Sequence, residues 1–144
     1  MLATFAFDVC HDVYRAAREV IDTKIPTLSM ESSGKYTWHP DRMPRLAEYV
    51  ADFARAGERA LEGCGKLHPS NSFRASRMAM FRVFYLGGAE YQAARRHLGI
   101  SELTWADWAE EIRTRVGQEL FRTGVFPPSK YFHASSIPAP GNAA

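Results

Sequence analysis

The residues best suited to chemistry lie between positions 89 and 121, where arginines and polar side chains surround a short glycine-containing turn. This turn reads Leu98-Gly99-Ile100-Ser101. Gly99 suits the left-handed backbone of a steep corner between two helices, and Ser101 suits the N-cap of the helix that follows. In helix-turn-helix proteins such a corner places the second helix in the major groove of DNA. The spacing therefore predicts a helix-turn-helix, while an ordinary corner between two helices with no nucleic acid nearby remains the alternative.

The side chains around this corner divide into base contacts and backbone contacts. On the second helix, an aspartate can accept a hydrogen bond from cytosine and a tryptophan can contact a thymine methyl group. Arginines at the end of the first helix can hold phosphates without regard to sequence. The residues expected to face the groove are Thr104, Asp107, Trp108 and Glu111, and those expected to contact phosphates are Arg95, Arg96, Arg113 and Arg115.

The corner resembles the promoter-reading helix-turn-helix of bacterial sigma factors, the domain that contacts the −35 element. Arg113 and Arg115 fall where that family often carries basic residues. A looser similarity, over about residues 42–132, includes the run Phe81-Arg82-Val83-Phe84-Tyr85-Leu86-Gly87-Gly88 and the closing Phe126-Pro127-x-x-x-Tyr131-Phe132. This longer stretch is similar to small sigma-like regulators of bacterial prophages and mobile elements. The resemblance implies DNA-binding transcriptional control without enzymatic activity, and contact with RNA polymerase or another transcription factor.

Hydrophobic periodicity predicts an all-α fold of about five helices, because apolar residues recur every three to four positions and no long alternation of period two occurs. The expected helices cover 4–22, 41–62, 73–86, 89–98 and 101–122, with loops at 27–39 and 63–72. A segment at 125–132 offers three aromatic side chains for docking. One compact domain would then contain an N-terminal helical pair (1–62), a sigma-like three-helix unit with its docking tail (72–132) and a disordered tail (133–144).

The apolar stripe predicts different positions for the two tryptophans of the last long helix. Trp105 falls on the apolar stripe and is predicted to belong to the core. Trp108 lies at the edge of that stripe, so the pattern leaves both a core position and an exposed contact open.

Composition bounds the class of protein. The chain has 144 residues, 18 Lys and Arg against 16 Asp and Glu, and a formal net charge of +2, which suits one globular domain without strong electrostatic character. Two cysteines make no disulfide framework, and neither a signal peptide nor a membrane span is recognisable. We therefore expect a cytoplasmic protein with no membrane partner.

Catalytic and metal-binding patterns are weak. Cys10, His11, Cys64 and His68 could be combined into a zinc site, but adjacent residues of a helix diverge by about 100° and the two pairs lie far apart. Gly63-Cys64-Gly65-Lys66 lacks the glycine spacing of a phosphate loop. We expect no enzyme, no cofactor and no metal.

Two other functions remain open. The acidic residues Asp107, Glu110 and Glu111 on the second helix suit a protein-interaction module that binds RNA polymerase or another regulator without DNA. A phage DNA-packaging or structural DNA-binding component would also use a helix-turn-helix, within a ring. Because one helix-turn-helix reads few base pairs, a homodimer is a further possibility.

Overall fold

The structure is a computed structural model that describes residues 2–23, 43–62 and 76–132. Every regular element in these ranges is a helix, which confirms the all-α fold class. The elements are α1 (Leu2–Thr23), α3 (Met43–Leu61), α4 (Arg77–Met80), the π-helical segment η2 (Phe81–Leu86), α5 (Tyr91–Leu98), α6 (Glu102–Thr123) and α7 (Ser129–Phe132). The predicted loops 27–39 and 63–72 and the predicted tail 133–144 lie outside the described residues.

The third expected helix is described from its N-cap onward. The Ser76 Oγ accepts a hydrogen bond from the N–H of Ala79 at 3.0 Å and so begins α4. The helix continues without a break into η2, whose wider turns end with the N–H of Gly87 donating to the carbonyl of Arg82, five residues earlier, at 2.8 Å. The last turn of η2 therefore leaves carbonyl oxygens that other elements can bind.

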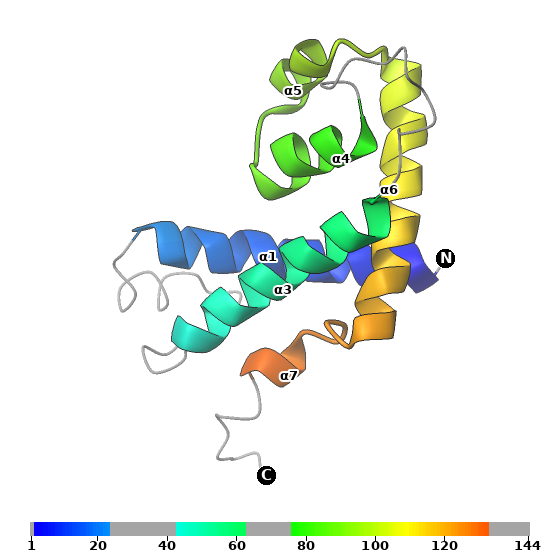
Figure 1. The fold of residues 1–144 in the computed structure, drawn as a ribbon. Helices are drawn as coiled ribbons and strands as arrows, with labels where there is room; N and C mark the ends of the chain where they lie inside the picture. The colour runs from blue at the N-terminus through cyan, green and yellow to red at the C-terminus, as the bar shows by residue number, and fades with distance from the viewer. Residues whose placement is uncertain (1, 24–42, 63–75, 133–144) are drawn as a thin grey trace.

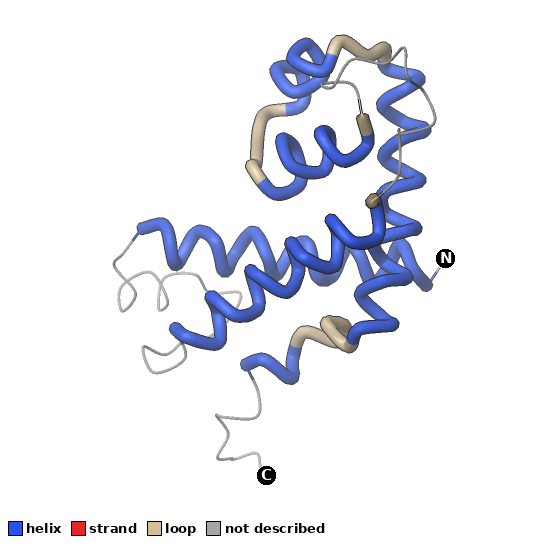
Figure 2. The backbone as a smooth tube through the Cα atoms, in the orientation of Figure 1, coloured by secondary structure: helices blue, strands red, loops and turns tan. Residues whose placement is uncertain are grey.

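The other helices are arranged around α6. Figure 1 shows α1 and α3 crossing its C-terminal half, while α4, η2 and α5 lie beside its N-terminal half. Figure 2 shows that the connections from η2 to α5 and from α5 to α6 are short. The corner between α5 and α6 consequently lies at the opposite end of α6 from α7.

Two glycines allow these helices to approach closely. A Cβ atom at Gly117 would overlap the carbonyl oxygen of Ala3, so α1 lies directly against the backbone of α6. A Cβ atom at Gly57 would overlap the ring of Phe81, which seats η2 on α3. The lower half of α6 and the start of η2 are thus both fixed to the N-terminal helices.

Aromatic side chains dominate the core between these helices. Phe7, Tyr49, Phe53 and Phe81 are among the largest fully buried side chains. Burial of each phenylalanine contributes about 1.5–3 kcal/mol. The Tyr49 hydroxyl donates to the carbonyl oxygen of Cys10 at 2.7 Å, so its polar atom is satisfied inside the core.

The segment after α6 returns to α3. Arg45 donates from Nε to the carbonyl oxygen of Tyr131 at 2.9 Å and from Nη2 to that of Lys130 at 2.8 Å. The Tyr131 hydroxyl donates to Oδ2 of Asp52 at 2.7 Å. These bonds hold α7 against α3. No helix in the described ranges is both long enough and apolar enough to cross a bilayer.

Candidate functional site

The corner between α5 and α6 is fixed by backbone and side-chain caps. Gly99 has φ of 70° and ψ of 35°, and its N–H donates to the carbonyl oxygen of Arg95 at 2.8 Å. The Ser101 Oγ accepts from the N–H of Thr104 at 3.1 Å and caps α6. Glu90 caps α5 in the same way, and these hydrogen bonds lower the pKa of its carboxyl group. The predicted left-handed glycine and serine cap are both present.

The inner side of α6 is held by packing. Trp105 is buried and meets the rings of Phe84 and Tyr91 edge-on, with centroid distances of 4.9 and 5.1 Å. Ile112 is completely buried one turn beyond Trp108. The prediction that Trp105 belongs to the core is confirmed, and α5 is attached to α6 through the pair Tyr91 and Trp105.

Trp108 lies on this inner side too, so the expectation that it faces a groove is wrong. Glu111 lies at the edge of this side, with its side chain 33% exposed, and its predicted contact with a groove stays a prediction. Trp108 is buried, and the guanidinium of Arg77 stacks 4.9 Å from its ring centroid. Arg77 also donates from Nε to Oε1 of Glu111 at 2.6 Å. The physical reason is Arg77 of α4, whose guanidinium contacts both side chains.

The outer side of α6 is exposed and acidic over its first three turns. We call this surface the outer face of α6; it consists of Glu102, Leu103, Ala106, Asp107 and Glu110. Leu103 is 80% exposed. No lysine or arginine occurs between Ser101 and Ile112. Of the predicted groove residues, Asp107 belongs to this face, whereas Thr104 is half-buried and its hydroxyl accepts from the Ser101 Oγ at 3.1 Å.

The predicted phosphate contacts are not brought together on one surface. Arg95 donates to the carbonyl oxygen of Ile100 at 3.2 Å and so braces the corner, whereas Arg96 is exposed. Arg113 binds both carboxylate oxygens of Asp8 on α1, at 3.0 and 2.8 Å. Arg115 donates from Nε to Glu111 at 3.0 Å. Three of the four arginines therefore already bind other parts of the chain.

Side chains of α1 support the corner by binding the end of η2. The His11 Nε2 is 2.8 Å from the carbonyl oxygen of Tyr85, and the Tyr14 hydroxyl donates to that of Leu86 at 3.0 Å. Burial lowers the pKa of His11. A neutral imidazole with its proton on Nε2 satisfies this geometry, so α1 completes the hydrogen bonds that the last turn of η2 leaves open.

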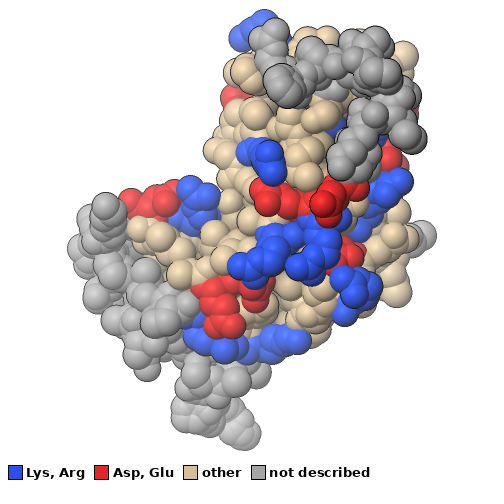
Figure 3. All heavy atoms as spheres, viewed as in Figure 1, with Lys and Arg blue, Asp and Glu red and all other residues tan. Residues whose placement is uncertain are grey.

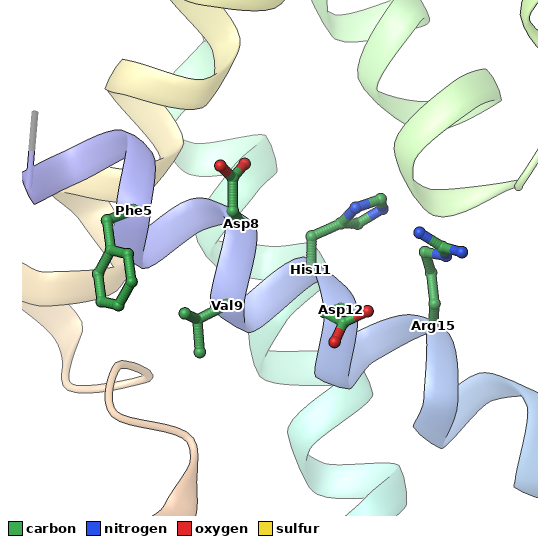
Figure 4. A pocket seen from close by; sticks show the side chains of 6 residues that line it. All are labelled: Phe5, Asp8, Val9, His11, Asp12 and Arg15. Atoms are coloured by element: carbon green, nitrogen blue, oxygen red, sulfur yellow. The ribbon is translucent and has the colours of Figure 1, made fainter. Parts of the chain in front are cut away.

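A shallow hollow of about 410 Å³ runs along the exposed side of α1. In Figure 4, Asp8, His11 and Arg15 point to one side of the helix, and Phe5, Val9 and Asp12 point to the other. Asp8 binds Arg113, and His11 binds Tyr85. Two polar groups of the hollow thus hold α1 to α6 and η2.

The described residues contain no cluster of three or more histidine, cysteine or acidic side chains that could hold a metal ion. Cys10 is buried, and burial raises the pKa of its thiol to about 12. Cys64 and His68, the other members of the zinc pattern, lie outside the described residues.

A second charged surface, which sequence reasoning missed, lies where α3 and α6 cross. We call it the arginine face; Figure 3 shows basic side chains interleaved with acidic ones in this region. Its residues are Arg55, Arg59, Arg77, Arg82, Arg115 and Arg122. The available signal was spacing: Arg55 and Arg59 are four residues apart on one helix, and Arg115 and Arg122 are seven apart on another.

No family model, curated protein or solved structure matches the chain.

Proposed function

We propose that this chain is a DNA-binding transcriptional regulator that uses the corner of α5 and α6 as a helix-turn-helix. The observation that carries the proposal is the exposure of the outer face of α6, from Glu102 to Glu110, while buried Trp105 and Trp108 hold the opposite side. A helix held in this way is accessible to a groove about 12 Å wide without leaving its own core.

The outer face suits recognition by hydrogen-bond acceptors. Glu102 and Asp107 can accept from the amino group of cytosine, and Leu103 can contact a thymine methyl group. Arg96 and His97 are exposed at the end of α5, and in this proposal they contact the phosphates beside the groove. Because the outer face itself is acidic, binding of this face to arbitrary DNA should be weak, and a second copy or a partner would be needed for high affinity.

A protein partner is the second candidate, and the acidity of the outer face favours it. Leu103 protrudes among Glu102, Asp107 and Glu110, which together present an apolar anchor within negative charge. This pattern is complementary to a basic surface with an apolar pocket. RNA polymerase or another transcription factor is the partner that the resemblance to sigma-like regulators implies.

Selection from fragmented bacterial and phage DNA separates the two candidates. DNA retained by the full chain is sequenced, and an enriched duplex is compared with its scrambled version by fluorescence anisotropy between about 50 and 200 mM salt. The DNA proposal predicts tighter binding of the enriched duplex and a steep loss of affinity with salt. Equal affinity for both duplexes contradicts it. In a parallel pull-down without DNA, recovery of a purified transcription protein with a basic surface, such as RNA polymerase, lost on Leu103→Ala, supports the second candidate.

A matched pair of variants tests whether α6 is responsible for the preference for the enriched duplex over the scrambled one. Leu103→Ala combined with Asp107→Ala should reduce the preference for the enriched duplex by at least about tenfold, since each of the two lost base contacts costs about 1–3 kcal/mol. Leu2→Ala combined with Asp22→Ala removes the same residue types from exposed positions on α1 and should leave the preference unchanged.

A further inference from the structure

The arginine face contains two clusters in which one carboxylate is shared by two arginines. Glu119 lies 3.7 Å from Nη1 of Arg59 and 2.6 Å from Nη2 of Arg122. Glu111 lies 2.6 Å from Nε of Arg77 and 3.0 Å from Nε of Arg115. Each cluster therefore holds two positive charges against one negative charge.

In the first cluster the surplus charge faces outward. The side chain of Glu119 is only 13% exposed, whereas those of Arg59 and Arg122 are 51% and 64% exposed. The hydrogen bond to Arg122 lowers the pKa of Glu119, so this carboxylate stays ionised beneath its arginines. An approaching molecule meets two guanidinium groups before it meets the acid.

The remaining pairs on this face do not cancel the surplus. Arg55 binds Asp52 at 3.0 Å and Arg82 binds Glu58 at 3.1 Å, and both pairs are neutral. Glu62 is also exposed, at the end of α3. Six arginines against these two acids, Glu62 and the two shared carboxylates leave a net charge of 6 − 5 = +1. The surplus positive charge therefore belongs to the two clusters.

The surface also offers room and donors for a phosphate group. A hollow of about 190 Å³ adjoins the first cluster, and its polar lining includes Arg55, Arg59 and Thr123. Asp52 also lines it, with its carboxylate bound by Arg55 and by the Tyr131 hydroxyl. In the second cluster Arg115 uses Nε for Glu111, and no described residue accepts from its Nη groups. The two shared carboxylates are eight residues apart on α6, about 12 Å along the helix, which corresponds to three or four nucleotides of one strand along a duplex axis.

We propose that the arginine face binds the phosphodiester backbone of a nucleic acid without regard to sequence. Guanidinium groups bind phosphate oxygens through charge-assisted hydrogen bonds. The face lies about 120° around α6 from the outer face, as the twelve positions from Leu103 to Arg115 require at 3.6 residues per turn. This proposal goes beyond the proposed function because phosphate binding by the arginine face does not require a helix in the groove.

The test measures affinity of the full chain for a scrambled 24-base-pair DNA duplex and for a single-stranded RNA of equal length, by anisotropy across 25–200 mM salt. Arg59→Gln with Arg122→Gln should weaken binding at least tenfold and reduce the salt slope by about two, since each lost phosphate contact removes about 0.9. Arg59→Lys with Arg122→Lys keeps both charges and should restore most of the affinity. The preferred nucleic acid is the one for which the loss is larger.

Arg15→Gln with Arg18→Gln is the control, because it removes the same charge from α1, outside the arginine face; circular dichroism verifies that every variant is folded. Binding by the Arg59/Arg122 glutamine variant within twofold of this control overturns the proposal. So does a wild-type chain that binds neither nucleic acid at 25 mM salt. Equal affinity for enriched and scrambled duplexes would contradict the helix-turn-helix proposal alone, since the arginine face ignores sequence.

Discussion

The hydroxyl of Tyr14 on α1 donates a hydrogen bond to the carbonyl oxygen of Leu86 at the end of η2, at 3.0 Å and across 72 residues of sequence. Arg18 donates in turn to the same hydroxyl at 3.0 Å. The bond links the N-terminal helices to the segment that leads into α5. The position of the corner therefore depends on α1 as well as on its own caps.

Removing this hydroxyl should measure the strength of the link. Tyr14→Phe should lower the free energy of unfolding by about 1 kcal/mol, because Leu86 loses a partly buried donor. Tyr91→Phe is the control, since no described residue bonds to the Tyr91 hydroxyl. Urea denaturation followed by circular dichroism compares the two variants. Equal stability of both would mean that water replaces Tyr14 without cost.

Substitution of Gly99 should lower stability because of the backbone conformation at this position, and not because a side chain lacks space. A Cβ atom there meets nothing within 4 Å, but φ of 70° is unfavourable for residues with side chains. Gly99→Ala should cost about 1–2 kcal/mol of unfolding free energy, and Gly99→Asn less, because asparagine tolerates the left-handed region. Denaturation in urea provides the comparison; a more stable alanine variant would show that the corner adopts another backbone.

Truncating a side chain on the inner side of α6 should lower the stability of the chain, whereas truncating one on its outer face should not. Trp108→Ala removes a buried ring that stacks on Arg77, and should cost about 3–5 kcal/mol. Leu103→Ala, at an exposed site, should change stability by no more than about 0.5 kcal/mol and act on binding instead. Thermal unfolding of both variants tests the assignment, and it fails if the leucine variant is the less stable one.

Acidification should destabilise the chain through His11. Burial is the main cause that lowers its pKa, opposed by the carbonyl of Tyr85 and by the carboxylates of Asp8 and Asp12, while Arg15 lowers it further. The unfolded chain thus binds a proton below about pH 6.5 that the folded chain resists. The free energy of unfolding should be level above that pH and fall below it.

A substitution separates this effect from other titrations. His11→Gln keeps a side-chain donor for Tyr85 and removes the ionisation. Urea titrations between pH 7.5 and 5.5 should show a flatter dependence for this variant than for the wild type. An identical pH dependence would assign the loss to other groups.

Local patterns were enough to predict the helices and the corner. The apolar stripe of residues 101–122 and the pair Gly99 and Ser101 reflect short-range rules of periodicity and capping. Trp105 was predicted correctly because it lies at the centre of that stripe. These features need no knowledge of which other elements pack nearby.

Contacts between residues far apart in the sequence determine the features that local patterns do not predict. Trp108 is buried with the guanidinium of Arg77 stacked on its ring, and Arg77 is 31 positions away in the sequence. The arginine face arises where α3 and α6 cross, so Arg59 and Arg122 meet over Glu119 only in the folded chain. Periodicity gives the side of each helix that is apolar, but not the neighbour that each polar edge will meet.

The measurement that tests the central claim most directly is an amide chemical-shift titration of the ¹⁵N-labelled chain with its enriched duplex. Occupation of the groove by α6 predicts that the largest changes fall on Leu103, Ala106, Asp107 and Glu110, with Arg96 beside them. Saturation with the duplex while these amides stay unchanged would contradict the claim that this helix reads DNA.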